Sequence, residues 1–151
     1  MEHHYGPRFR ALHWCTDQNM SAALAQMELT AAQGHIVGFL ARQESPPCAR
    51  DIEEAFGLSH PTVSGTLNRM EKKGFIELRP DADDRRCKRI HILPKGLECY
   101  ARIIENIHRI ENQVVRDFTS EERELFSQFL DRAITNMGGT RYPLPPIKEE
   151  L

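Results

Sequence analysis

The chain has 151 residues, a formal net charge of −2 and four cysteines. A chain of this length buries about two thirds of its unfolded surface, so it can form a core without disulfide bonds. No apolar run approaches the roughly 18 residues of a transmembrane helix, and the first residues lack the apolar core of a secretory signal. We therefore expect a cytoplasmic protein whose cysteines are free thiols: Cys15, Cys48, Cys87 and Cys99.

The charges are unevenly distributed along the chain. Residues 59–96 contain nine Lys/Arg and five Asp/Glu, whereas both flanking segments are acidic. A basic segment between acidic flanks is typical of a nucleic-acid-binding element with separate scaffolding. A solvated charged surface would give a similar excess of positive charge. The motifs inside this segment must therefore distinguish a nucleic-acid-binding element from such a surface.

Two helices are predicted before residue 45. Residues 9–27 carry apolar side chains at helical spacing without an internal Gly or Pro. Thr30 and Gln33 have the spacing of a capping box, which predicts that a second helix begins there. Gly34 and Gly38 would allow a neighbouring element to approach closely. The apolar positions that make this helix largely buried are Ile36, Val37, Phe39 and Leu40.

A short third helix is predicted after the break at residues 45–47. The two prolines of Ser45-Pro46-Pro47 suit the first turn of a helix. This helix would end at Phe56 with Ile52, Ala55 and Phe56 facing inward. Gly57 is suited to the left-handed conformation that follows a helix end.

The fourth predicted helix begins after Ser59, a favourable N-cap residue, and ends before Gly74. Val63, Leu67 and Met70 lie on one stripe that faces the core. The other positions are mostly small and polar, which would let the helix backbone approach base edges in a major groove. A short helix, a Gly-containing turn and a helix of this kind form a helix-turn-helix pattern.

Residues 75–93 predict a β-hairpin. Residues 75–79 and 88–93 alternate like strands around a charged turn at residues 80–86. A long helix follows, from about Pro94 to Phe118, and Thr119 with Glu122 forms a second capping box before a last helix. The apolar positions of the long helix are Leu97, Ala101, Ile104, Ile107, Ile110 and Val114 or Val115; those of the last helix are Leu125, Phe126, Phe129, Leu130, Ile134 and Met137.

The predicted fold is mainly α with a small β-hairpin wing (α+β). It is a winged helix-turn-helix with flanking helices, formed by residues 1–151 as a single domain. Residues 30–96 would form the DNA-binding lobe, residues 7–29 and 97–137 the dimerisation helices, and residues 138–151 a Pro-rich tail. The flanking helices are too apolar and too long to be covered by a small DNA reader, so we expect a homodimer. Two recognition helices about 34 Å apart would reach successive major grooves.

The sequence resembles the multiple-antibiotic-resistance regulator (MarR) family over residues 9–137. The segments that carry the resemblance are Leu29-Thr30-Ala31-Ala32-Gln33, residues 61–76 and Asp81-Ala82-Asp83-Asp84-Arg85-Arg86. The resemblance implies an obligate dimer that represses transcription from a pseudo-palindromic operator. It also implies release of the DNA when an effector binds.

The resemblance and the residue types together predict three sets of DNA contacts. Side chains at the start of the fourth helix should face the major groove: Ser59, His60, Pro61, Thr62, Ser64 and Thr66. Phosphate contacts are expected from Arg69, Lys72 and Lys88. At the wing tip, Arg86 and Arg85 should enter a minor groove, where the potential is negative. Asp84 or Asp81 would hold the arginine by a charge-assisted bond.

Three effectors are compatible with the sequence, and no obligatory cofactor is expected. A small aromatic or anionic ligand could bind a cavity lined by Arg10, His13, Trp14, Phe39 and Arg42. Peroxide could be sensed at Cys15, as in relatives with a cysteine in the first helix, although the second helix lacks their tyrosine. Zinc could bind Asp17, His35 and His108, although a fourth family position is Ile104.

Two other function classes were weighed. The chain carries no nucleophile elbow, zinc-protease motif, phosphate-binding Gly-rich loop or dinucleotide fingerprint, so an enzyme is not expected. A winged helix can also be a protein-interaction module. The basic wing and the small polar helix face favour DNA over a protein partner.

Overall fold

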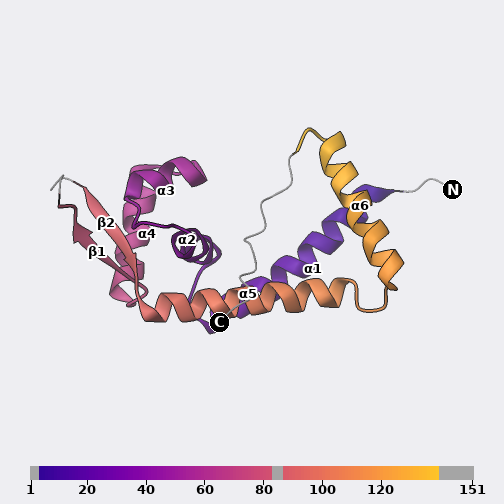
Figure 1. Ribbon diagram of the computed structural model, residues 1–151, viewed down its shortest axis with the longest axis horizontal. Helices are drawn as coiled ribbons and strands as arrows, with labels where there is room; N and C mark the ends of the chain where they lie inside the picture. The colour runs from indigo at the N-terminus through magenta and orange to yellow at the C-terminus, as the bar shows by residue number, and fades with distance from the viewer. Residues whose placement is uncertain (1–3, 83–86, 140–151) are drawn as a thin grey trace. The chain divides into compact units, whose positions relative to one another are not determined.

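The structure is a computed structural model that describes residues 4–82 and 87–139 (Figure 1). In chain order its elements are α1 (Tyr5–Gln26), α2 (Ala31–Ala41), α3 (Ala49–Phe56), α4 (His60–Lys72), β1 (Ile76–Pro80), β2 (Lys88–Ile92), α5 (Pro94–Val114) and α6 (Ser120–Asn136). The chain divides into two compact units, residues 1–110 and residues 111–151. No helix within the described ranges is long and apolar enough to cross a membrane. The predicted mainly helical fold with one β-hairpin is confirmed.

The helix α2 begins where the capping box predicts. The Gln33 amide donates to the Thr30 hydroxyl at 3.3 Å, and the Thr30 amide donates to the Gln33 side chain at 3.0 Å. The helix α1 begins at Tyr5, a few residues before the predicted start, and buries only Ala23 and Leu24. A Cβ atom on Gly34 would lie 2.8 Å from a Leu24 methyl group. The prediction of a close approach at this glycine is therefore confirmed.

Removing this cap tests how much it stabilises the first unit. We expect Thr30→Ala to lower the free energy of unfolding by about 1 kcal/mol, because the Gln33 amide in the first turn of α2 loses its hydroxyl acceptor. Thr16→Ala in α1 is the matched control, since its hydroxyl only donates back to the carbonyls of Leu12 and His13. Urea titration should show a control change within about 0.5 kcal/mol. Equal losses in both variants would contradict the capping role.

The start of α3 differs from the prediction. The prolines do not occupy its first turn: Cys48 is the N-cap residue, and its amide donates to the Asp51 carboxylate at 2.7 Å. The Pro47 carbonyl instead accepts from the Ile90 amide at 2.8 Å, and Cys48 forms an antiparallel bridge with Arg89. Residues before α3 thus extend the sheet edge, which an extended Pro-rich segment can do.

The hydrophobic core of the first unit lies between α2, α3, α4 and the hairpin. The two strands are antiparallel, and Leu78 pairs with Ile90 while Ile76 pairs with Ile92. Ala55, expected to face inward, is exposed, and Phe56 is only half-buried. The largest fully buried side chains are Phe75, Ile36, Ile52, Met70, Ile76, Ile90, Val37 and Val63.

The helix α5 buries only part of the predicted stripe: Ile110 is buried and Ile107 packs against the core, but the earlier predicted positions do not. Its buried residues are Gly96, Cys99, Ile103 and Ile110, whereas Leu97 is 48% exposed. Ala101 is also exposed, and Ile104 is half-buried. The first half of the predicted stripe lies away from the core, because both faces of α5 carry apolar side chains and periodicity alone does not choose between them.

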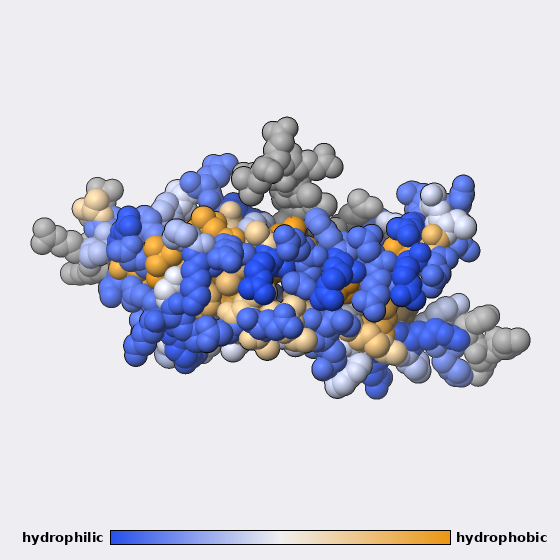
Figure 2. All heavy atoms as spheres, turned by 90° about the horizontal axis from the view of Figure 1, so that it is seen from below, coloured by the Kyte–Doolittle hydropathy of each residue, from blue (hydrophilic) through white to orange (hydrophobic). Residues whose placement is uncertain are grey.

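The helix α6 belongs to the second unit and begins at the predicted capping box. The Glu122 amide donates to the Thr119 hydroxyl at 3.2 Å, and Phe118 contacts Phe126 edge to face at 5.5 Å. The helix buries no residue in the single chain. Figure 2 shows apolar residues reaching the surface among the charged ones. The large exposed apolar residues of α6 and its C-cap are Leu125, Phe129, Leu130, Ile134 and Met137.

Candidate nucleic-acid interface

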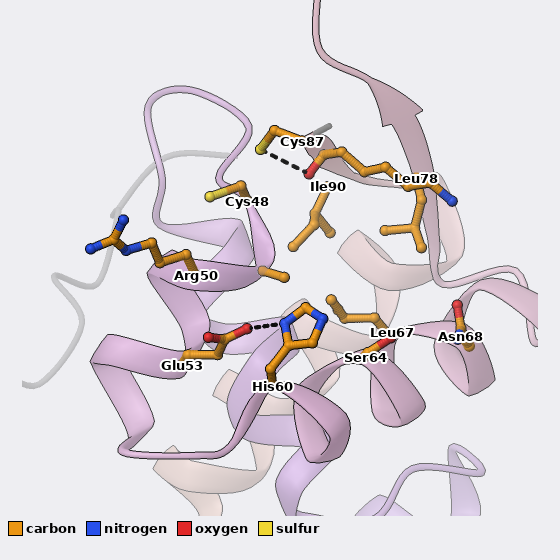
Figure 3. A pocket seen from close by; sticks show the side chains of 12 residues that line it. Cys48, Arg50, Glu53, His60, Ser64, Leu67, Asn68, Leu78, Cys87 and Ile90 are labelled. Carbon is orange, nitrogen blue, oxygen red and sulfur yellow. Dashed lines mark hydrogen bonds and ion pairs between the residues drawn. The ribbon is translucent and has the colours of Figure 1, made fainter. Parts of the chain in front are cut away.

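The α3–α4 pair forms a helix-turn-helix with the predicted turn. Gly57 adopts a left-handed conformation at φ 62°, and the Leu58 amide donates to the Glu53 carbonyl at 3.1 Å. Ser59 is the N-cap of α4, but its hydroxyl bonds the Thr62 hydroxyl at 2.9 Å and not a backbone amide. The His60 ring lies 2.6 Å from the Glu53 carboxylate (Figure 3). These bonds fix where α4 begins relative to α3.

The helix α4 separates an apolar face from a polar one. Val63, Leu67 and Met70 are at most 3% exposed, as the stripe predicts. Thr66 was expected at the major groove, but it is only 7% exposed and donates to the Thr62 carbonyl at 2.8 Å. That prediction is wrong, because the hydroxyl is satisfied inside the helix and faces the core side. The exposed residues of α4 are His60, Pro61, Thr62, Asn68, Arg69, Glu71 and Lys72, and Ser64 is half-exposed.

Asn68 is a surface residue that the sequence reasoning missed. It lies four residues after Ser64, so both side chains lie on one helix face. Both also line the groove described below. The spacing of four residues was the signal that could have added Asn68 to the predicted contacts.

A groove of about 540 Å³ lies between α4 and the outer half of the hairpin. Figure 3 shows side chains from α3, α4 and both strands pointing into it. Its residues are Cys48, Ala49, Arg50, Glu53, His60, Ser64, Leu67, Asn68, Leu78, Cys87, Lys88 and Ile90. The hairpin is tied to α4 because the Leu78 amide donates to the Glu71 carboxylate at 2.8 Å. The groove therefore joins two predicted DNA-contacting elements, the start of α4 and the outer end of the wing at Lys88.

One ion pair crosses the outer end of the hairpin, and a second lies along β1. Asp81, whose side chain is 9% exposed, pairs with Arg89, and this contact raises the pKa of the Arg89 guanidinium. The Arg79 guanidinium lies 2.7 Å from the Glu77 carboxylate, and its hydrogen bond lowers the pKa of that carboxyl. The predicted minor-groove residues Asp84, Arg85 and Arg86 lie outside the described residues, so their role stays a prediction.

The phosphate-contact predictions fall on exposed positions. Arg69 and Lys72 are exposed in the second half of α4, and Lys88 is exposed at the start of β2. The Arg69 guanidinium donates to the Thr66 hydroxyl at 3.2 Å, which directs it along the helix surface. The three cations are thus accessible to a polyanion, and their contacts stay a prediction.

The predicted effector residues occupy separate places in the structure. Arg10 and Trp14 line a shallow hollow of about 390 Å³ on α1, together with Pro7 and Ala11. Phe39 contacts Phe56 edge to face at 5.7 Å, and Arg42 is the C-cap of α2. His13 is exposed on α1. Neither described hollow contains all five predicted residues: Arg10, His13, Trp14, Phe39 and Arg42.

The structure bears differently on the predicted redox residue and on the predicted metal ligands. Cys15 is a free, exposed thiol on α1, which leaves its role as a peroxide sensor untested. Within residues 4–82 and 87–139, no three His, Cys, Asp or Glu side chains lie close enough to hold a metal ion. The single chain therefore does not assemble Asp17, His35 and His108 into a zinc centre.

Comparison with known proteins agrees with this geometry. A model of the MarR family matches residues 27–86. The HTH-type transcriptional regulator YwaE of Bacillus subtilis (strain 168) is 26% identical over 91 residues, which cover 60% of this chain and 53% of the relative. The chain thus spans about half the length of that curated relative.

Solved structures match nearly the whole chain. The S. aureus MepR–DNA complex has a TM-score of 0.74 and 28% identity, covering 85% of this chain and 96% of that chain. A mutant of S. aureus MepR has a TM-score of 0.82 and 27% identity, covering 89% of this chain and 99% of that chain. The fold and the site together define a winged helix-turn-helix protein. The chain is similar to the MarR family over residues 27–86, and it shares the fold of S. aureus MepR.

Proposed function

We propose that this chain is a sequence-specific regulator of transcription that binds double-stranded DNA in the cytoplasm. The observation that carries this proposal is the two-sided helix α4. Its apolar stripe is buried, and its polar face presents short side chains next to the groove that α4 forms with the outer half of the wing. Short side chains let a helix backbone approach base edges closely. The resemblance to S. aureus MepR, whose structure was solved in complex with DNA, supports a DNA-binding role.

The proposed contacts divide into two kinds. Ser59, His60, Pro61, Thr62 and Ser64 lie at the start of α4, which is the part of a recognition helix that reads base edges. The exposed cations that would bind phosphates and position the helix are Arg69, Lys72 and Lys88. Thr66 is not included in the first kind, because its hydroxyl is used within α4.

The proposed assembly is a homodimer on a pseudo-palindromic operator. The helices α1 and α6 expose large apolar side chains, among them Phe9, Trp14 and Phe129, which are between 55% and 63% exposed. Apolar exposure on this scale is typical of surfaces that a partner covers. A second copy of the chain would cover them and would place two α4 helices on successive major grooves.

The proposed regulation is repression that an effector relieves. The hollow beside Arg10 and Trp14 offers a guanidinium and an indole ring, which suit a small aromatic or anionic ligand. A ligand there would act on the proposed dimerisation helix α1, and so on the spacing of the two recognition helices.

The salt dependence of binding to DNA from upstream of its own coding region tests the proposed function. Three phosphate-binding cations in each protomer give six contacts, so log K should fall with log salt at a slope of about −5. Fluorescence anisotropy at several salt concentrations measures this slope. A slope near zero, with no preference for that DNA over an unrelated duplex, would instead favour a protein-interaction module.

A further inference from the structure

The structure brings together two thiols that lie 39 positions apart in the sequence. Cys48 is the N-cap of α3, and Cys87 directly precedes β2. They meet because the segment before α3 pairs with β2: the Ile90 amide donates to the Pro47 carbonyl at 2.8 Å, and Cys48 bridges Arg89. Figure 3 shows both side chains at the same end of the groove. This contact was not predicted from the sequence.

The surroundings of the two thiols differ from those of the other cysteines. Cys99 is buried in the core, whereas Cys48 and Cys87 are half-buried and both line the groove, so a small solute can reach them. Partial burial raises the pKa of the Cys87 thiol, and hydrogen bonding with Cys48 adds to the rise. Cys48 lies within electrostatic range of the Arg50 and Arg89 guanidinium groups.

We propose that a hydroperoxide oxidises Cys48 and Cys87 to an intrachain disulfide, and that this bond weakens DNA binding. The second part of this inference rests on the proposed function. The Cys48 sulfur attacks the terminal oxygen of the hydroperoxide, the O–O bond breaks, Cys48 becomes a sulfenic acid, and the alcohol leaves with the thiol proton. The Cys87 thiol then attacks this sulfur, the S–S bond forms, and the hydroxyl leaves as water with the Cys87 proton. The two thiols are oxidised by two electrons, and the peroxide is reduced by the same two.

The effect on DNA follows from the place of the bond in the fold. A disulfide requires Cβ atoms about 3.8 Å apart, so its formation fixes the start of β2 against the N-terminus of α3. Lys88 follows Cys87 directly and moves with it. Ser64 and Asn68 lie on the opposite side of the same groove. With the disulfide formed, Lys88 is held at a fixed position relative to α3, so its distance from Ser64 and Asn68 can no longer adjust to the duplex.

The test uses a full-length Cys15→Ser/Cys99→Ala variant, which keeps only the proposed pair. Cumene hydroperoxide is added, free thiols are alkylated, and peptides are mapped without reduction. We expect a linked peptide pair containing Cys48 and Cys87. The DNA affinity should fall about tenfold, equivalent to one or two phosphate contacts, and dithiothreitol should restore it.

Single variants separate the disulfide from other oxidation. In the same background, Cys48→Ser and Cys87→Ser should each bind DNA with an affinity that peroxide leaves unchanged. Thiols that remain alkylatable after peroxide, or a linked pair that leaves the affinity unchanged, would overturn the inference. A reduced protein that does not bind DNA would count against the proposed function, while the peptide map would still decide whether the disulfide forms.

Discussion

Arg69→Glu should lower the affinity for operator DNA by at least about 100-fold, which corresponds to about 2.8 kcal/mol. Arg69 is exposed on the polar face of α4, where it would lie against the phosphate backbone. The substitution replaces an attraction by a repulsion, and a dimer carries it twice. The slope of log K against log salt should also become smaller in magnitude by about two, because two phosphate contacts are lost. Anisotropy titrations at several salt concentrations measure both quantities.

The matched control, Arg109→Glu, makes the same change of charge on α5 instead of α4. Arg109 is exposed on α5 and donates to the Asn106 side chain at 2.7 Å. Arg109→Glu should keep the DNA affinity within about threefold, because charges beyond the Debye length of about 10 Å are largely screened. Circular dichroism and sedimentation should show unchanged helix content and oligomeric mass in both variants. Equal losses of affinity would mean that net charge, and not the face of α4, governs binding.

Local signals in the sequence predicted the boundaries of most elements. A capping box needs only a hydroxyl and an acceptor three residues apart, and both predicted boxes, at Thr30 and Thr119, are present. Gly57 and Gly74 adopt the positive φ angles that end a helix. Such features depend on neighbouring residues alone, so the sequence displays them directly.

Burial was harder to predict because it depends on distant partners. Thr66 is polar by type, yet the Thr62 carbonyl satisfies its hydroxyl, so the side chain can lie on the buried side of α4. In α5 the predicted stripe included Leu97, but the core covers Cys99 and Ile103. Residue type and periodicity give the candidate faces, and the neighbouring elements select one of them.

The groove between α4 and the outer half of the wing is a second case in which distant partners decide which residues come together. Its start-of-α4 residues, His60 and Ser64, were predicted from the helix-turn-helix pattern. Cys48 was not, because its position depends on a short pairing between a Pro-rich segment and β2. A single bridge has no alternating pattern, and prolines argue against a strand. Non-local pairing of this kind is visible only in the folded chain.

Gly96→Ala should lower the free energy of unfolding by about 2–3 kcal/mol, because it overpacks a close contact between α5 and the hairpin. A Cβ atom at this position would lie 2.5 Å from the Phe75 carbonyl oxygen and 2.8 Å from the Ile92 side chain. The carbonyl cannot retreat cheaply, since it accepts the Leu93 amide at 3.0 Å. Lys95 also fixes this junction, with its ammonium 4.4 Å from the centre of the Phe75 ring. Urea unfolding followed by circular dichroism measures the loss.

Gly38→Ala is the control, because Gly38 is also a buried helical glycine but has room for a methyl group. The nearest atom to its added Cβ is the end of the Arg42 side chain at 3.6 Å, an ordinary contact. This variant should gain up to about 1 kcal/mol, since alanine favours a helix interior over glycine. Opposite signs in the two variants would locate the cost at the junction of α5 with the hairpin. A stabilising Gly96→Ala would show that the junction yields, and that the wing is not held against α5 as tightly as the backbone contact requires.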